Sequence, residues 1–269
     1  MSVLKDIKNL RIQGATEIAL RSLKYLKKFI GKKDFNKKCK QLLNARPTAV
    51  TLYNVLQELK KEPTKEKIDE LLKALEESNK KIAKTGSPLI KNGKRVQTHC
   101  HSSSALAIIK EAAKNKKFTV IVDETRPKRQ GIKTAKELSK IKNIEVILLV
   151  DSAAGLALSP PVIPMSDIVI VGTDAIRKEG VINKTGTYLL ALAAAENGIP
   201  FYVAASRFKF DKRKKIKIEE RPTKEVYRKI KNVKIMNPAF DITPWKYITG
   251  VVTENGIKKP LEIMKELRG

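Results

Sequence analysis

The sequence predicts an α/β protein with an N-terminal helical domain, residues 1–92, and a C-terminal Rossmann-like domain with a mainly parallel sheet, residues 93–269. Two observations predict this architecture. Up to residue 94, apolar residues recur only at helical spacing, without strand-like alternation. Beyond residue 94, short apolar runs rich in Val and Ile alternate with helical patterns. That alternation is typical of a parallel sheet covered by helices on both faces.

The N-terminal domain is expected to contain three helical segments. The first apolar stripe spans residues 4–30 and is interrupted near Gly14. A second helix is predicted after Pro47, over residues 48–60. A third covers residues 68–84, where Ile68, Leu71 and Leu75 share one face.

Five apolar runs are the predicted strands of the second domain, and they cover residues 95–100, 118–124, 144–151, 167–174 and 200–206. Helical patterns over residues 102–114, 133–141 and 186–198 separate some of them. Ligands of such sheets bind outside the carboxyl ends of the strands. This rule gathers residues 99–104, 123–126, 151–152, 172–174 and 205–209 at one polar rim, where we expect the active site.

The formal net charge of +28 is the strongest compositional signal, and it raises the possibility of a nucleic-acid partner. The excess is spread along the chain, however, and only 12 of the 56 basic residues are arginine. The densest patch, residues 207–234, shows no aromatic platform and no zinc-finger pattern. We therefore expect no nucleic-acid partner. A lysine-rich solvated surface or attraction to a phosphorylated small substrate explains the charge.

Location and redox state follow from features that the chain lacks. No apolar run approaches the roughly 18 residues of a membrane span, and the N-terminus shows no secretory signal. Cys39 and Cys100 alone do not make a disulfide framework. We expect a cytoplasmic protein without a membrane partner.

His99, Cys100 and His101 stand side by side and suggest three kinds of chemistry. On a strand, alternate side chains point to opposite faces, so the three make a poor metal cage, and no further histidine exists to complete one. We expect no metal. The serines that follow open a helix, whose free N–H groups bind phosphate and lower the pKa of a nearby thiol. Cys100 is thus a candidate thiolate, and a packed, inert cysteine is the alternative.

Several other rim residues have a possible role in binding or catalysis. Asp174 follows a buried strand, where a carboxyl can stay protonated and act as a general acid, although a helix cap is the alternative. Asn183 and Lys184 supply an amide and a cation beside the next helix, and Lys209 repeats the cation after a later strand. Arg46 offers a phosphate fork if the helical domain folds over the rim.

Ordered motifs over nearly the whole chain resemble those of a sugar-phosphate isomerase superfamily. The motifs are RIQGATEIA, NARPTAV, THCHSSSA, VDETRPKRQGIKTAKEL, VDSAA, VGTDAI, GVINKTGT and NPAFDITP. The superfamily includes methylthioribose-1-phosphate isomerases, ribose-1,5-bisphosphate isomerases and regulatory subunits of the eukaryotic translation-initiation guanine-nucleotide exchange factor. The resemblance is strongest to the archaeal ribose-1,5-bisphosphate isomerases. It implies Cys100 and Asp174 as the catalytic pair, which the regulatory subunits generally lack.

The same resemblance implies a set of substrate-binding positions: Gln13, Gly14, Ala15, Thr16, Arg46, Ser102, Ser103, Ser104, Asn183, Lys184 and Lys209. Two of them depart from the usual pattern, because the family generally has Arg at the position of Gln13 and Lys at that of Ser103. Both departures bear on the identity of the substrate.

The resemblance also implies a reaction and an assembly. We expect an aldose–ketose isomerase that converts ribose 1,5-bisphosphate into ribulose 1,5-bisphosphate in AMP recycling. It would need no cofactor and would form a homo-oligomer, a dimer or a hexamer. Two alternatives remain: a methylthioribose-1-phosphate isomerase, and a non-catalytic regulatory subunit that binds a translation factor.

Overall fold

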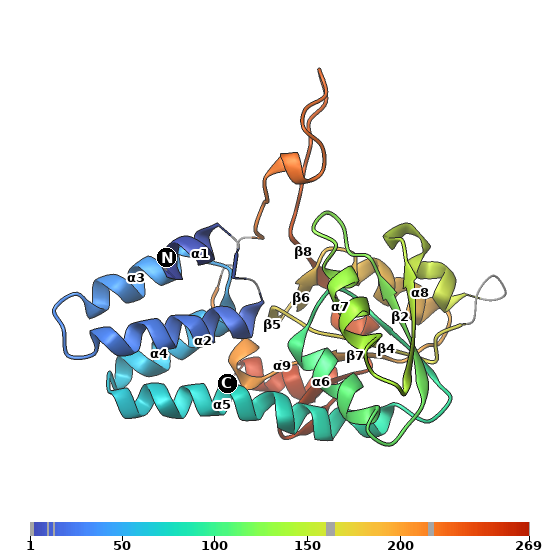
Figure 1. Ribbon diagram of the computed structural model, residues 1–269, viewed down its shortest axis with the longest axis horizontal. Helices are drawn as coiled ribbons and strands as arrows, with labels where there is room; N and C mark the ends of the chain where they lie inside the picture. Colours follow the sequence, from blue (N-terminus) through green and yellow to red (C-terminus); the bar gives the residue numbers. More distant parts are fainter. Residues whose placement is uncertain (1–2, 10, 13, 160–164, 215–217, 269) are drawn as a thin grey trace.

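The computed structural model describes residues 3–9, 11–12, 14–159, 165–214 and 218–268. The helical domain and the sheet domain lie side by side (Figure 1), and a projecting arm, residues 219–239, rises where they meet. Among the described residues, no helix is long and apolar enough to cross a membrane.

The N-terminal region is helical, as predicted. Its helices are α1 (Val3–Lys8), α2 (Ala15–Leu26), α3 (Phe35–Ala45), α4 (Val50–Lys61) and α5 (Lys65–Gly86). Helix α3 is an addition to the predicted set, and the first predicted stripe is divided into α1 and α2 at Gly14, whose φ is +86°. Thr64 caps α5 by accepting a hydrogen bond from the Lys67 N–H. The apolar stripes of these helices form one buried cluster.

The second region is built on a seven-stranded sheet with the order β10-β9-β7-β4-β1-β2-β3. Its strands are β1 (Arg95–Thr98), β2 (Phe118–Asp123), β3 (Ile144–Leu149), β4 (Ile168–Val171), β7 (Phe201–Ala204), β9 (Gly250–Thr253) and β10 (Gly256–Lys258). All neighbours pair in parallel except β10, which is antiparallel to β9. The five predicted strands are confirmed, and the sheet is mainly parallel.

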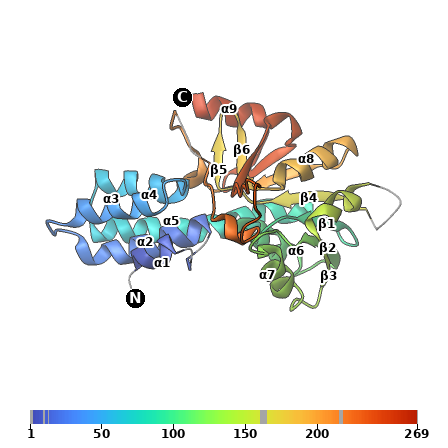
Figure 2. The same ribbon diagram turned by 90° about the horizontal axis from the view of Figure 1, so that it is seen from above.

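Helices cover both faces of this sheet, which explains the continuous apolar strands. Helices α6 (Ser103–Ala112) and α7 (Gln130–Leu138) lie on one side, and α8 (Thr187–Glu196) and α9 (Pro260–Arg268) on the other (Figure 2). Successive residues of β4 divide between two cores. Ile168 and Ile170 pack with α6, whereas Val169 and Val171 pack with α8.

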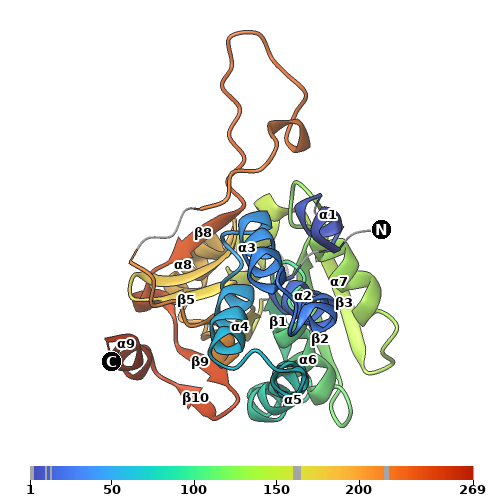
Figure 3. The same cartoon turned by 90° about the vertical axis from the view of Figure 1, so that its left-hand side faces the viewer.

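A second, smaller sheet was not predicted. Its antiparallel strands β5 (Ala175–Arg177), β6 (Gly180–Lys184) and β8 (Phe240–Thr243) have the order β5-β6-β8. The sheet leads into the arm, which extends away from the rest of the molecule (Figure 3). It also positions Lys184, which is the last residue of β6.

The two regions share packing across the boundary expected between residues 92 and 93. Ile82 of α5 joins the core beneath α6, and Phe208 of the sheet region is buried among the N-terminal helices. The amide of Asn54 on α4 donates to the carbonyls of Phe208 and Phe210, at 2.9 and 2.8 Å. These contacts hold the helical region against the rim of the sheet.

Candidate active site

The strand order reverses beside β1, because β2 and β3 lie on one side of it and β4, β7 and β9 on the other. Crevices at such switch points are the usual ligand sites of open α/β sheets. The loops after β1 and β4 carry Cys100 and Asp174, and both residues line one cavity of about 870 Å³. The helical region closes its other side with Arg46 and the start of α2.

Most of the predicted site residues line this cavity: Gly14, Ala15, Thr16, Arg46, Cys100, Ser102, Ser103, Asp174, Asn183, Lys184 and Lys209. Gln13 lies outside the described residues. Ser104 is buried instead, and its hydroxyl donates to Asn79 Oδ1 at 2.8 Å, which ties α6 to α5. We therefore assign Ser104 a structural contact, whereas Asn79 itself lines the cavity.

The loop that carries Cys100 is fixed on both sides of the thiol. Strand β1 ends at Thr98, and Cys100 has a φ of +68°, in the left-handed region that side chains rarely adopt. Its N–H donates to Thr125 Oγ1 at 3.0 Å, and its carbonyl accepts from Thr134 Oγ1 at 2.8 Å. Strain held by surrounding bonds in this way is found at functional sites.

The pKa of Cys100 differs in direction from the sequence-based expectation. Removal from water raises the pKa of the thiol to about 12, and nearby Asp174 also raises it. The His101 N–H and Lys184 act in the opposite direction but do not outweigh burial. Near neutral pH Cys100 is therefore a thiol. The helix start that follows it does not lower the pKa enough to make a thiolate.

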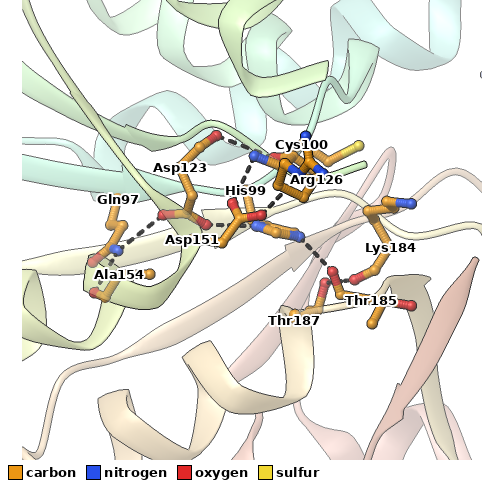
Figure 4. Close-up of polar contacts among 12 residues, drawn as sticks. Gln97, His99, Cys100, Asp123, Arg126, Asp151, Ala154, Lys184, Thr185 and Thr187 are labelled. Atoms are coloured by element: carbon orange, nitrogen blue, oxygen red, sulfur yellow. Dashed lines mark hydrogen bonds and ion pairs between the residues drawn. The ribbon is translucent and has the colours of Figure 1, made fainter. Parts of the chain in front are cut away.

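The two histidines bond to different elements, and His101 lines the cavity whereas His99 is absent from its lining. His99 is buried and joins Asp123 Oδ2 at 2.5 Å and the Thr185 carbonyl at 3.0 Å (Figure 4). Burial disfavours its charge, but the hydrogen bond and charge of Asp123, together with the Thr185 carbonyl and Asp151, outweigh this and raise the pKa of His99. His101 Nδ1 bonds to Thr134 at 2.9 Å, and burial lowers the pKa of His101.

His99, Asp123 and Asp151 form the one group among the described residues with spacing suited to a metal ion, within 4.8 Å of one another. The possible ligand atoms of these residues already make hydrogen bonds within the protein. The His99 ring is bonded on both sides, and the Asp151 oxygens accept the N–H groups of Thr125 and Arg126, at 2.6 Å each. This network fixes the loops on either side of Cys100.

Asp174 has the environment that a general acid requires. Strand β5 follows it rather than a helix, which removes the alternative that Asp174 is a helix cap. Removal from water raises the pKa of the Asp174 carboxyl, against the opposing charges of Lys209 and Arg46. The protonated form is therefore favoured more than in an ordinary aspartate.

Two lysines bring positive charge to the bottom of the cavity. Lys184 ends β6 and is 5% exposed, and Lys209 lies in the short helix Arg207–Lys209 and is 4% exposed. Burial lowers the pKa of each, while Asp174 acts to raise both. The Lys184 ammonium and the Cys100 sulfur extend toward the same side, away from the His99–Asp123 pair (Figure 4).

Backbone groups at two helix starts add to the positive potential. Gly14 is the N-cap of α2, and Ala15 and Thr16 form its first turn at the cavity. Ser102 caps α6, with its Oγ accepting from the Ala105 N–H at 3.4 Å. Free N–H groups at such ends favour anions.

Sequence reasoning did not single out several polar residues in or beside the cavity. Lys128 and Arg221 line the cavity, and Asp241 Oδ2 accepts the N–H groups of Gly186 and Tyr188 at the start of α8. Lys128 and Asp241 lie in the motifs RPKRQG and NPAFDITP and Arg221 lies in neither, and nothing in the local sequence distinguishes the three from the many surface charges.

The fold and the site together define a Rossmann-like α/β protein with a cationic crevice that contains one thiol and one carboxyl. A family model described as the Initiation factor 2 subunit family matches residues 11–260. The chain belongs to this family, as the motifs predicted.

Relatives with different names are similar to this chain. A ribose 1,5-bisphosphate isomerase of Methanocaldococcus jannaschii is 38% identical, over 97% of this chain and 92% of the relative. The crystal structure of translation initiation factor eIF-2B from Pyrococcus horikoshii OT3 has a TM-score of 0.85 and 34% identity, over 97% of both chains. That of 5-methylthioribose 1-phosphate isomerase from the same organism has a TM-score of 0.76 and 29% identity, over 99% of this chain and 86% of that one.

Proposed function

We propose that this protein is an aldose–ketose isomerase that converts ribose 1,5-bisphosphate into ribulose 1,5-bisphosphate. The observation that carries the proposal is the cavity that Cys100 and Asp174 share with the buried cations Lys184 and Lys209. Relatives named ribose 1,5-bisphosphate isomerase support the choice of substrate.

The reaction needs an acid and a base because the anomeric oxygen of the substrate is blocked by phosphate. Asp174, protonated, donates its proton to the ring oxygen as the bond between that oxygen and C1 breaks. Cys100, as a thiolate, removes the proton from C2, and the electron pair forms the C1–C2 double bond of an enol phosphate. Cys100 then returns its proton to C1, and the C2 hydroxyl proton passes to Asp174. This gives the ketose and restores both groups.

Cys100 must lose its proton before it can act as a base, because burial raises its pKa to about 12. The Lys184 ammonium favours the thiolate, because its charge acts to lower the pKa of Cys100. Loss of the thiol proton to water would leave a thiolate–ammonium pair inside the cavity. Lys209 and Arg46 remain to bind phosphate and neutralise charge.

Substitution of either catalytic side chain tests the proposal. We expect Cys100→Ser and Asp174→Asn each to lower kcat by roughly 10²–10⁴-fold, because each removes one proton-transfer group. Ketose formation from ribose 1,5-bisphosphate is the measurement, with substrate affinity followed by calorimetry. Cys39→Ser is the matched control, since Cys39 is buried among the N-terminal helices.

Three outcomes decide among the candidates. Near-normal turnover by either variant would remove the proposed roles. Turnover of methylthioribose 1-phosphate in place of the bisphosphate would assign the chain to the other isomerase branch. A wild-type protein that turns over neither sugar, yet binds a translation initiation factor, would support the regulatory alternative, which the eIF-2B likeness favours.

We also propose that the protein is a homo-oligomer, a dimer or a hexamer. The support is the arm, which carries five exposed apolar side chains in the isolated chain: Val226, Tyr227, Ile230, Val233 and Met236. Clustered exposed apolar side chains commonly mark a protein interface.

A further inference from the structure

Alternating charges cross the mouth of the cavity from the helical region to the loop after β2. Arg46 Nη2 lies 3.1 Å from Glu219 Oε2, and Glu219 Oε1 lies 3.7 Å from Arg221 Nη1. Arg221 binds Glu225 through Nε and Nη2, at 2.9 and 2.8 Å. Lys128 Nζ completes the row, 3.1 Å from Glu225 Oε1. Three cations are thus held by two carboxylates.

The cations face the cavity, and the carboxylates do not. Arg46, Lys128 and Arg221 belong to the cavity lining, whereas Glu219 and Glu225 are absent from it. Glu225 is 8% exposed, and its bonds to Arg221 and Lys128 hold its pKa at about 2, although burial acts to raise it. The Glu225 carboxylate therefore stays charged and supports Arg221 and Lys128 from behind.

Donor groups in this row remain available on the cavity side. Arg221 uses its Nε and Nη2 for Glu225, which leaves Nη1 with only the longer approach to Glu219. Arg46 Nε is buried and has no hydrogen-bond partner among the described residues. A buried, unpaired guanidinium N–H beside an open cavity indicates a missing acceptor, and phosphate oxygens suit it.

We propose that Lys128 and Arg221, positioned by Glu225, bind one of the two phosphates of a bisphosphorylated pentose. This inference rests on the proposed function, because it assigns the second anionic group of that substrate. Lys184 and Lys209, which interact with Asp174, are further cations of the same cavity, and the charges of Arg221 and Glu225 also act on Lys184. The cavity thus offers more than one cation to each of the two phosphates of one pentose.

The proposed phosphate subsite depends on the arm, because Glu225, which positions Lys128 and Arg221, is an arm residue. Arg221, Glu225 and Asn237 all lie in the arm, and the Asn237 amide donates to Glu225 Oε2 at 3.4 Å. The Arg221 N–H donates to the Asn237 carbonyl at 2.9 Å, which closes the base of the arm. The arm therefore contributes a specificity-determining pair to the cavity rather than only an external surface.

Binding measurements on variants test the assignment. Lys128→Met keeps the apolar stem of a side chain that is 42% exposed, so the fold should tolerate it. Arg221→Lys keeps the charge and loses the two-point bond. Lys73→Met is the control, because Lys73 is 76% exposed on α5, outside the cavity lining. Calorimetry would compare ribulose 1,5-bisphosphate with ribulose 5-phosphate, and a turnover assay would run in parallel.

We expect Kd for the bisphosphate to rise roughly tenfold or more in Lys128→Met and Arg221→Lys, which corresponds to one lost charge-assisted bond. The affinity for the monophosphate should fall less than about threefold, because that ligand can bind at the unaltered Lys184 and Lys209. If the variants lost the same affinity for both ligands, or none, the assignment of Lys128 and Arg221 would be wrong. Normal turnover by the wild type would still support the proposed function. If the variants lost affinity for the bisphosphate alone and the wild type showed no turnover, the phosphate subsite would be supported and the isomerase activity rejected. A wild type that binds neither ligand would reject both.

Discussion

At the scale of single residues, the thiol of Cys100 has a chemical state that labelling can measure. With a pKa of about 12, it should react with iodoacetamide roughly 10²-fold more slowly than free cysteine at pH 7, because the thiolate is the nucleophile. The rate should climb with pH and reach no plateau below about pH 11. The Cys39→Ser variant would leave one thiol to follow, and Cys100→Ser would report the background from Cys39.

A plateau near pH 7 or 8 would contradict this prediction. It would mean that the start of α6 stabilises the thiolate more than burial destabilises it, which is what the sequence alone suggested. The helix start lowers the pKa of the Cys100 thiol and burial raises it. The degree of burial in the cavity determines which effect is larger.

Residue types and their strand-end positions were predictable, and their environments were not. Cys100 and Asp174 each follow an apolar run, so the parallel-sheet rule placed them on one rim. The pKa of Cys100 depends on burial by elements that are distant in the sequence and on the opposing charges of Asp174 and Lys184. Lys128 and Arg221 could not be distinguished among 56 basic residues without coordinates.

At the scale of elements, the long apolar strands could be predicted from the sequence and the short strands could not. Strand β2 is a six-residue run buried on both faces, which gives a strong signal. Strand β5 has three residues, and β8 has exposed and partly exposed positions that lack a clear pattern. The small sheet therefore depends on tertiary pairing of β6 with both neighbours.

Close approach of β4 to the start of α6 requires a glycine at position 172. A Cβ there would lie 2.0 Å from Ser102 Oγ and 2.4 Å from Ser102 Cβ. We expect Gly172→Ala to lower the free energy of unfolding by about 1–3 kcal/mol and to reduce kcat, because it displaces the cap beside Cys100. Denaturant unfolding and turnover are the measurements.

The double variant Gly172→Ala, Ser102→Gly provides the control. Glycine at the N-cap costs only a few tenths of a kcal/mol, and it removes both clashing atoms. The double variant should therefore be more stable than Gly172→Ala alone. Additive losses would show that the crowding at Ser102 is not the cause.

At the scale of the whole molecule, the cavity exists because the two regions are packed together. Phe208 is 2% exposed among the N-terminal helices, and the next residue is Lys209 at the cavity. Arg46 reaches the cavity from the opposite side. The sequence indicated both regions. It did not indicate whether they pack together, so a role for Arg46 at the rim depended on that packing.

Assembly is the prediction that belongs to the whole chain. If the arm mediates a homo-oligomer, light scattering should give a multiple of the 30.2 kDa chain mass. Because each chain carries a formal net charge of +28, repulsion opposes association, and raising the salt from about 50 to about 500 mM should favour the oligomer by screening. Tyr227→Ser with Met236→Ser, which removes exposed apolar surface from the arm, should shift the mass toward 30.2 kDa.

Leu189→Ser is the matched control, since Leu189 is 71% exposed on α8, away from the arm. A wild-type mass of 30.2 kDa at both salt concentrations would contradict the homo-oligomer. An oligomer that the arm variant leaves unchanged would instead exclude the arm as the interface. Because Arg221 and Glu225 lie at the base of the same arm, loss of the oligomer should also weaken binding of the bisphosphate. That coupling would link assembly of the molecule to its proposed substrate.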